Sequence, residues 1–368
     1  MLSSKTNLKP KMVAQDEFRA FYDSHLKPNL LALEDQRKGI VRKFTLIVIG
    51  TVMIALLFMA VVAGIMDMLL IDEEDQKLFF FIATFGTIIG IVVMLIYIAF
   101  VYRKMVAPYK NHFKKKIISP IVTLIDDNLV YDPEKKISFN EFRASQLFKS
   151  KGVDVFHGED YVAGKLSKTA VKFSEVHAQE EDYYYDAEEG SYQYYTTVFE
   201  GLFFVFNFHL NFQGVTLILP DFGERYSGKF GKWLQSWKAK ATDRQLVEFA
   251  NPAFEKEFVV YSNNPAMARY VLSNHFLSRL LLFHNRLKKP VYLSFIDGKL
   301  YMAITVHKDL FEPPVFSTVL NFQLVQEFFE YLQLGREIVE DLSTFLNQPS
   351  PYLPVVNFPL QNNHNFEL

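Results

Sequence analysis

The sequence predicts an α+β fold, in which an N-terminal transmembrane helical hairpin is followed by a cytoplasmic domain with a mainly antiparallel sheet and several helices. Two long uncharged runs in the N-terminal third predict the hairpin, and short strand-like segments separated by turn residues from Gly152 onward predict the sheet. Helices and strands do not alternate strictly in this second part, so a doubly wound parallel fold is not expected.

The two uncharged runs, residues 44–66 and 78–101, are long enough to cross a lipid bilayer. At 1.5 Å per residue each makes a helix of about 35 Å, whereas the hydrocarbon core of a bilayer is about 30 Å thick. Helices in the core of a soluble protein rarely stay uncharged for this length, so a two-helix transmembrane hairpin is expected over residues 44–102.

The charges that flank the two runs predict their orientation. Residues 1–43 carry nine Lys and Arg against five Asp and Glu, and residues 102–116 carry six basic residues and no acid. The connection 67–77 carries five acids and one lysine. Basic flanks stay on the cytoplasmic side of a membrane. Both termini are therefore predicted to be cytoplasmic, and the acidic connection to be external.

The segments that adjoin the spans are predicted to be helical. Residues 1–43 should contain a cytoplasmic amphipathic helix, because apolar side chains recur at helical spacing, with an interruption or kink at Pro28. Residues 103–150 should form a basic helical connector. Its basic residues within 103–116 would make a solvated helix face and would also attract anionic lipid headgroups, at about 1 kcal/mol per residue.

A cytoplasmic α+β domain is expected over residues 151–345, followed by a loose tail over 346–368. Just before the domain, Ser138 and Glu141 make a capping box for a helix that should end near Ser150. The predicted elements are strands at 160–178 with a turn at 164–168, at 192–210, 215–219, 246–249 and 258–261, a hairpin at 291–306 that turns at Asp297–Gly298, and helices at 264–286, broken near Ser273, and at 319–345.

The run GLFFVFNFHL at residues 201–210 is predicted to be the central core strand. Side chains alternate between the two faces of a strand. The face that carries Phe206 is apolar throughout and should lie in the core. The face that carries Phe203 starts apolar and then turns polar, so its first half should be covered by a helix or by a partner.

Composition excludes several classes of function. The chain has no cysteine, which excludes disulfides, thiolate metal sites and a cysteine nucleophile. The net charge of −2 gives no reason to expect a nucleic-acid partner. No catalytic constellation is recognisable in the sequence, and neither catalytic residues nor a cofactor are predicted.

The best candidates for metal ligands are His157, Glu159, Asp160, Glu175 and His177. Glu175 and His177 would share one face of a strand, and imidazole with carboxylate suits a hard or borderline cation. No motif with metal-ligand spacing supports the cluster. The alternative is that these side chains are solvated and that the Gly-Glu-Asp run makes a turn.

A loop near the middle of the chain resembles a phosphate-binding motif. Gly223, four intervening residues, Gly228 and Lys229 follow a strand, as in a Walker A loop. Phe230 stands where the motif needs Ser or Thr for magnesium. We therefore expect Lys229 to be a solvated turn residue, and no nucleotide site.

Residues 180–195 contain six acidic residues and six tyrosines, in the order EEDYYYDAEEGSYQYY. They are expected to form an exposed hairpin tip that turns at Gly190. A recognition surface is the alternative, because tyrosine suits contacts with one apolar and one wet end.

Five segments carry a resemblance to a known family: EFRASQLF (141–148), GEDYVAGKLSKTAVKFSEVHA (158–178), FEGLFFVFNFHLNFQG (199–214), EFVVYSNNPAMARYVLS (257–273) and VYLSFIDGKLYMAI (291–304). Their order and spacing resemble the bacterial domain-of-unknown-function family DUF3137. The resemblance covers roughly residues 100–310. It implies a two-span protein of the bacterial inner membrane, and it implies no particular reaction.

Two functions are compatible with these patterns. The first is a membrane-anchored cytoplasmic binding or scaffold module that is not catalytic, with the lipid bilayer and a protein as partners. The second is an enzyme or a transport accessory that uses the acidic and histidine cluster around residues 157–177. Convergence of those side chains in one pocket would favour the second.

Overall fold

The computed structural model describes residues 13–68, 73–148, 152–186, 190–208, 213–221 and 244–346. Contacts between Cα atoms divide the chain into two compact units. The first unit comprises Met1–Glu134 and Lys308–Gln333, and the second comprises Lys135–His307 and Leu334–Leu368. The first unit therefore combines the N-terminal part of the chain with a segment that follows it by more than 170 residues.

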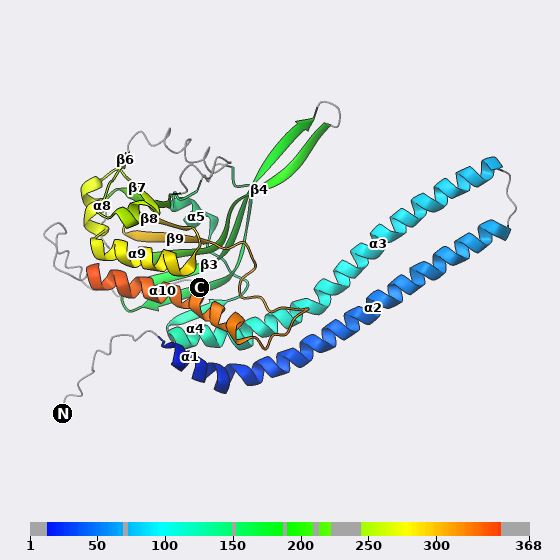
Figure 1. Ribbon diagram of the computed structural model, residues 1–368, viewed down its shortest axis with the longest axis horizontal. Coiled ribbons are helices and arrows are strands. Elements are labelled where there is room, and N and C mark those ends of the chain that lie inside the picture. The colour runs from blue at the N-terminus through cyan, green and yellow to red at the C-terminus, as the bar shows by residue number, and fades with distance from the viewer. Residues whose placement is uncertain are drawn as a thin grey trace, which may run out of the picture. The chain divides into compact units, whose positions relative to one another are not determined.

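The first unit is built on two long antiparallel helices, α2 (Lys27–Met68) and α3 (Glu73–Phe113) (Figure 1). They contain the predicted spans. The shorter elements around them are α1 (Gln15–Phe21), η1 (Tyr22–Leu26), η2 (Lys114–Ile118), α4 (Ser119–Ile125) and β1 (Leu129–Asp132).

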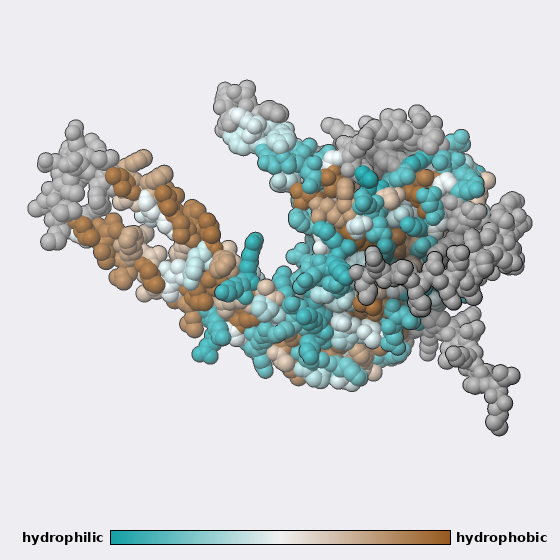
Figure 2. Space-filling model, turned by 180° about the vertical axis from the view of Figure 1, so that it is seen from behind, coloured by the Kyte–Doolittle hydropathy of each residue, from teal (hydrophilic) through white to brown (hydrophobic). Residues whose placement is uncertain are grey.

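Two helical stretches, Gln15–Ile65 and Phe81–Ile125, each contain an 18-residue window that is long and apolar enough to cross a membrane. No part of either window is buried inside the structure. Figure 2 shows hydrophobic residues at the surface along both helices. By length and composition, both helices could cross a membrane.

Both short π-helices end two residues before a proline. η1 ends at Leu26 before Pro28, and η2 ends at Ile118 before Pro120. Proline lacks a backbone N–H and its ring clashes with the carbonyl four residues earlier, whereas a π-helical turn lets the helix widen at that point. The interruption predicted at Pro28 therefore takes the form of a π-helix, after which the helical backbone continues.

Helix α10 (Phe322–Leu346) closes the core of the first unit with its N-terminal half. The ring of Phe18 in α1 stacks on Phe329 with 4.0 Å between ring centroids, and the ring of Phe113 meets Phe328 edge-on at 6.1 Å. Phe18 and Phe113 are at most 1% exposed. The apolar spacing that predicted the N-terminal amphipathic helix thus marks its buried face.

The second unit contains an antiparallel sheet with the strand order β2-β3-β4-β9-β8-β5-β7-β6. This arrangement, with the helices that pack on it, confirms the predicted α+β class. The strands are β2 (Val155–Leu166), β3 (Thr169–Asp186), β4 (Gly190–Asn207), β5 (Val215–Pro220), β6 (Gln245–Leu246), β7 (Phe258–Ser262), β8 (Val291–Ile296) and β9 (Lys299–Thr305).

Local sequence signals set several turns and helix ends of this unit. Asp297 and Gly298 both have positive φ, 49° and 74°, as a type I′ turn between β8 and β9 requires. The predicted helix at 264–286 is broken where expected, into α8 (Pro265–Val271) and α9 (Asn274–Leu287). The hydroxyl of Ser273 caps α9 by accepting a hydrogen bond from the backbone N–H of Phe276.

The helix cap at Ser138 is present, because its Oγ accepts from the backbone N–H of Glu141 at 3.3 Å and donates to the Glu141 carboxylate at 3.1 Å. The helix that it starts, α5 (Phe139–Ala144), is shorter than predicted. Gln146 has a φ of 53°, a left-handed conformation that a helix does not continue. Another short helix, α7 (Pro252–Glu255), precedes β7.

Helices cover both faces of the sheet (Figure 1). On one face, Phe142 of α5 packs on Phe203 of β4, with 5.1 Å between ring centroids. On the other face lie α9 and the C-terminal half of α10, where Gly335 lies beside Phe204 and Phe173. Phe206 on that face is 0% exposed. The core-strand prediction is therefore confirmed, and the expected cover over Phe203 is α5.

Candidate functional site

The predicted metal ligands lie on the β2–β3 hairpin. Its register places His157 opposite His177 and Glu159 opposite Glu175. Directly opposed residues of an antiparallel pair project to the same face, and residues two apart on a strand do so as well. The backbone thus brings these four side chains to one face of the hairpin.

Asp160 differs from the other four candidates. It lies where the β2–β3 register shifts, has a φ of 59° and is fully buried. Such a position is a β-bulge, which turns a side chain away from the regular alternation. Within the part of the chain that the structure describes, no three His, Asp or Glu side chains are grouped so that they could hold a metal ion. The metal site stays a prediction.

The sheet adds two residues that the sequence did not single out. Glu200 of β4 lies opposite His177 in the register, and its carboxylate is 3.4 Å from Nδ1 of His307. His177 itself contacts the hydroxyl of Thr197 at 3.4 Å. Glu200 and His307 are distant in sequence from residues 157–177, so only the strand order could have revealed this row.

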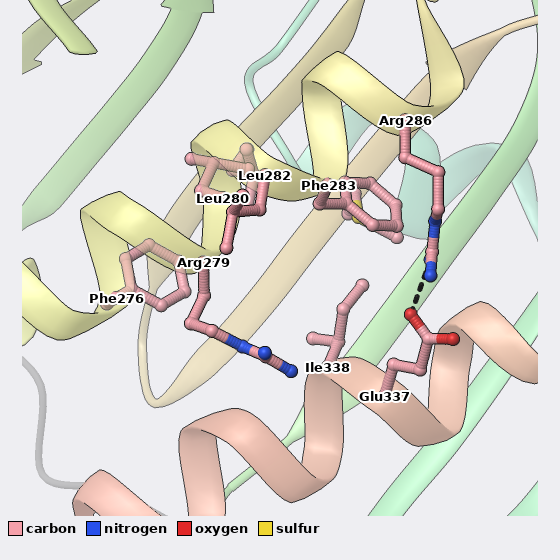
Figure 3. Close-up of a pocket in the computed structure, with 10 residues that line it drawn as sticks. Phe276, Arg279, Leu280, Leu282, Phe283, Arg286, Glu337 and Ile338 are labelled. Atoms are coloured by element: carbon pink, nitrogen blue, oxygen red, sulfur yellow. Dashed lines mark hydrogen bonds and ion pairs between the residues drawn. The ribbon is translucent and has the colours of Figure 1, made fainter. Parts of the chain in front are cut away.

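A cavity of about 300 Å³ lies between α9, the C-terminal half of α10 and the strands β8 and β9 (Figure 3). Leu293 and Met302 from the strands form its floor. Apolar side chains of both helices form most of its wall, namely Phe276, Leu280, Leu282, Phe283 and Ile338.

The rim of the cavity is charged. Arg279 and Arg286 extend from α9 toward α10, as Figure 3 shows. The guanidinium of Arg286 is 2.5 Å from a carboxylate oxygen of Glu337 on α10. An apolar interior with charged groups of both signs at its mouth suits a small molecule that is mostly apolar and has one polar or charged end. No sequence pattern predicts this site, because Arg286 and Glu337 are brought together only by the fold.

The basic segment 103–116 is divided between two roles. Lys110 and Lys114 form ion pairs with Glu312, at N–O distances of 2.9 and 3.0 Å. The other four basic residues of the segment are exposed, namely Arg103, Lys104, Lys115 and Lys116. Part of the charge predicted for lipid headgroups is thus neutralised within the first unit.

The acidic and tyrosine-rich segment forms the outer part of the β3–β4 hairpin. The pairing of β3 with β4 continues outward to Asp186 opposite Gly190, whereas β2 pairs with β3 only as far as Val155 opposite Gln179. Tyr183, Tyr184 and Tyr195 are each at least half exposed. The predicted exposed hairpin is confirmed in the residues that the structure describes. The Walker-like residues Gly223 to Phe230 lie outside the described residues.

Known proteins provide few points of comparison. A search of the curated proteins found no match. Among solved structures, the chain is similar to the crystal structure of the mycobacterial trehalose monomycolate transport factor A, TtfA, at 12% identity. That similarity covers 64% of this chain and 96% of that chain, with a TM-score of 0.33.

A family model gives a more direct comparison. The model described as "Protein of unknown function (DUF3137)" matches residues 197–344. This stretch includes every residue that lines the cavity. The match names the same family as the resemblance carried by the five sequence segments, three of which lie within residues 197–344.

Proposed function

We propose that this chain is a membrane-anchored, non-catalytic binding module of the bacterial inner membrane. The observation that carries the proposal is the pair of helices α2 and α3, whose apolar windows are exposed over a full membrane thickness. Soluble monomers rarely expose continuous apolar surfaces of this size, whereas lipid covers them at no cost.

The proposed orientation rests on charge. Exposed basic residues flank both spans, and they include Arg42 and Lys43 before the first and Arg103 and Lys104 after the second. The connection 67–77 is acidic. Both termini and both folded units are then cytoplasmic. The same exposed basic residues attract anionic headgroups.

The cavity between α9 and α10 supports the binding role. Its volume is at the lower end of the range for pockets that hold small molecules. No specific observation favours the enzyme or transport-accessory alternative, because the residues around 157–177 are paired across the β2–β3 hairpin and lie outside the cavity. The exposed tyrosines of the β3–β4 hairpin supply a surface for a protein partner.

Reporter fusions test the anchor and its orientation. Green fluorescent protein fused after Leu368 or before Leu2 is expected to fluoresce, and alkaline phosphatase at the same positions to be inactive. Phosphatase inserted into the connection 67–77 is the matched control and is expected to be active. Phosphatase activity at Leu368 would overturn the orientation. Release of the full chain from membranes by alkaline carbonate would overturn the anchor.

Ligand binding at the cavity is tested with sodium octanoate, a small apolar anion, by calorimetric titration of the full chain in nanodiscs. Ile338→Trp fills the cavity and is expected to weaken octanoate binding by about tenfold or more. Leu246→Trp, on the exposed strand β6, is the control and should bind as the wild type does. Equal affinities for all three proteins would contradict the assignment of the site.

A further inference from the structure

The loop Asp309–Asn321, between β9 and α10, is held against the long helices of the first unit. Nη1 of Arg37 donates to the carbonyl of Val315 at 3.0 Å, and the hydroxyl of Tyr109 donates to the carbonyl of Pro314 at 3.1 Å. The first contact comes from α2 and the second from α3. The loop is thus attached to both helices of the pair.

Two further sets of contacts fix the ends of the loop. The carboxylate of Glu34 accepts a hydrogen bond from the backbone N–H of Val319 at 3.1 Å. Glu312 pairs with Lys110 and Lys114 of the basic segment. Because Glu34 and Lys114 are both at most 5% exposed, the contacts of these two residues are shielded from water and from salt.

Between these attachments, the apex of the loop reaches the end of the spans. The ring of Phe316 stacks on Tyr102 with 5.9 Å between centroids, and Tyr102 meets Phe44 at 5.3 Å. Phe44 opens the first predicted span and Tyr102 directly follows the second. Tyr109, which binds the base of the loop, and Tyr102 are about 10 Å apart along the helix.

The apex is apolar, exposed and uncharged. Phe316 is 69% exposed and Leu320 is 38% exposed, and Ser317 and Thr318 between them are exposed as well, whereas Val315 and Val319 are buried. No charged residue occurs between Glu312 and Glu327. The neighbouring surface at the ends of the spans carries the exposed basic residues Arg42, Lys43, Arg103 and Lys104.

We propose that the segment Val315–Leu320 is a third membrane contact, which places Phe316 in the interfacial zone of the bilayer beside the two spans. The inference rests on the proposed membrane anchor. Aromatic rings gather at the headgroup level of membrane proteins, and basic side chains at the same level bind the lipid phosphates. The occupant of this surface is lipid because the surface is continuous with the spans and positively flanked.

Single-cysteine labelling tests the contact, since the chain has no cysteine of its own. Phe316→Cys in the full chain is labelled with the fluorophore NBD and reconstituted in phosphatidylcholine–phosphatidylglycerol vesicles. Spin-labelled lipids with the quencher at the headgroup, at acyl carbon 5 or at acyl carbon 12 report its depth. We expect strong quenching by the two shallow quenchers and weak quenching by the deep one. Leu320→Cys should be quenched less strongly, with the same ranking of the three quenchers.

Two control positions separate this inference from the anchor itself. Met53→Cys, in the middle of the first span, should be quenched most by the deep quencher. Val130→Cys is 70% exposed and lies in β1, roughly 35 Å of helix beyond Tyr102, so it should not be quenched.

Quenching at residue 53 without quenching at residue 316 would overturn the third contact but not the membrane anchor. A surface at Phe316 that binds protein instead of lipid would give this result. No quenching at either residue would overturn both proposals. Equal quenching at residues 130 and 316 would also overturn the third contact, because it would then report non-specific collisions.

Discussion

The buried carboxylate of Glu34 accepts hydrogen bonds from the guanidinium of Arg37 at 2.7 and 2.9 Å. These bonds, against the opposing effect of burial, lower the pKa of Glu34 from 4.5 to about 2. A carboxyl whose folded-state pKa is depressed stabilises the fold fully above its unfolded pKa and loses that contribution as the pH falls through the folded value. The contribution is at most about 3 kcal/mol.

The first unit should therefore lose stability as the pH falls from about 4.5 to about 2. Thermal unfolding of the detergent-solubilised chain over this range measures the effect. Glu34→Gln should be less stable at neutral pH, since Arg37 keeps its charge, and should lack this acid-dependent loss. Asp23→Asn is the control, because Asp23 pairs with Arg19 only at the exposed surface. The same acid loss in Glu34→Gln as in the wild type would contradict the assignment.

Gly201 is the glycine of β4 that the fold needs most. Its φ is 146°, and a Cβ at this position would collide with the backbone carbonyl of Ile304 and the backbone nitrogen of Val306. We expect Gly201→Ala to lower the free energy of unfolding by about 3 kcal/mol. Gly190→Ala is the matched control, with a φ of 92° and open space around the Cβ, and should cost about 1 kcal/mol. Denaturant titration measures the free energy of unfolding of both variants. Equal losses would show that the backbone contact at Gly201 does not determine the cost.

At the scale of elements, the position of β4 in the core predicts a large loss of stability when its side chains are shortened. Phe206 is fully buried, paired with Val171 on one side and Leu300 on the other. Phe206→Ala should lower the free energy of unfolding by about 3–5 kcal/mol, because it leaves a cavity in a packed layer. Tyr195→Ala, on the exposed part of the same strand, should change it by less than about 1 kcal/mol. A wild-type denaturation midpoint for Phe206→Ala would show that this layer is not the core.

The sequence predicted the elements that depend on neighbouring residues. The β8–β9 turn follows from Asp297–Gly298, because both residues tolerate the positive φ of a type I′ turn. The break at Ser273 follows from a hydroxyl that caps the next helix. In both cases the determining interaction lies within four residues along the chain, so the local sequence contains it.

Elements that depend on distant residues were not predictable in this way. β4 lies beside β9, which follows it by about a hundred residues, and no local pattern encodes that neighbour. The cavity and the row from His177 to Glu200 and His307 arise from this strand order. The short α5 has a different cause, because the left-handed Gln146 ends it and glutamine carries no signal for that conformation.

At the scale of the whole molecule, the exposed charges at the ends of the spans should select lipids. Replacing Arg42, Lys43, Arg103 and Lys104 together by Gln should lower the share of phosphatidylglycerol that purifies with the protein in native lipid discs. Each removed charge accounts for about 1 kcal/mol. Mass spectrometry of the lipids gives the measurement.

The control for this experiment is the double variant Lys115→Gln with Lys116→Gln. These lysines are exposed as well, but they lie about 18 Å farther along the helix than Arg103. That separation exceeds the screening length at physiological salt. An equal fall in phosphatidylglycerol for both variants would show that net charge, rather than position at the spans, determines the lipid preference.

The pairing of Phe18 with Phe329 also has a consequence for biosynthesis. The ribosome releases α1, α2 and α3 first, yet the aromatic residues that close over α1 are made about 300 residues later. At about 5–20 residues per second, this delay is roughly 15 to 60 s. During that interval the apolar face of α1 has no intramolecular cover, so a nascent chain stalled before α10 should be a substrate for chaperones, and truncation before Phe322 should leave the first unit unable to fold.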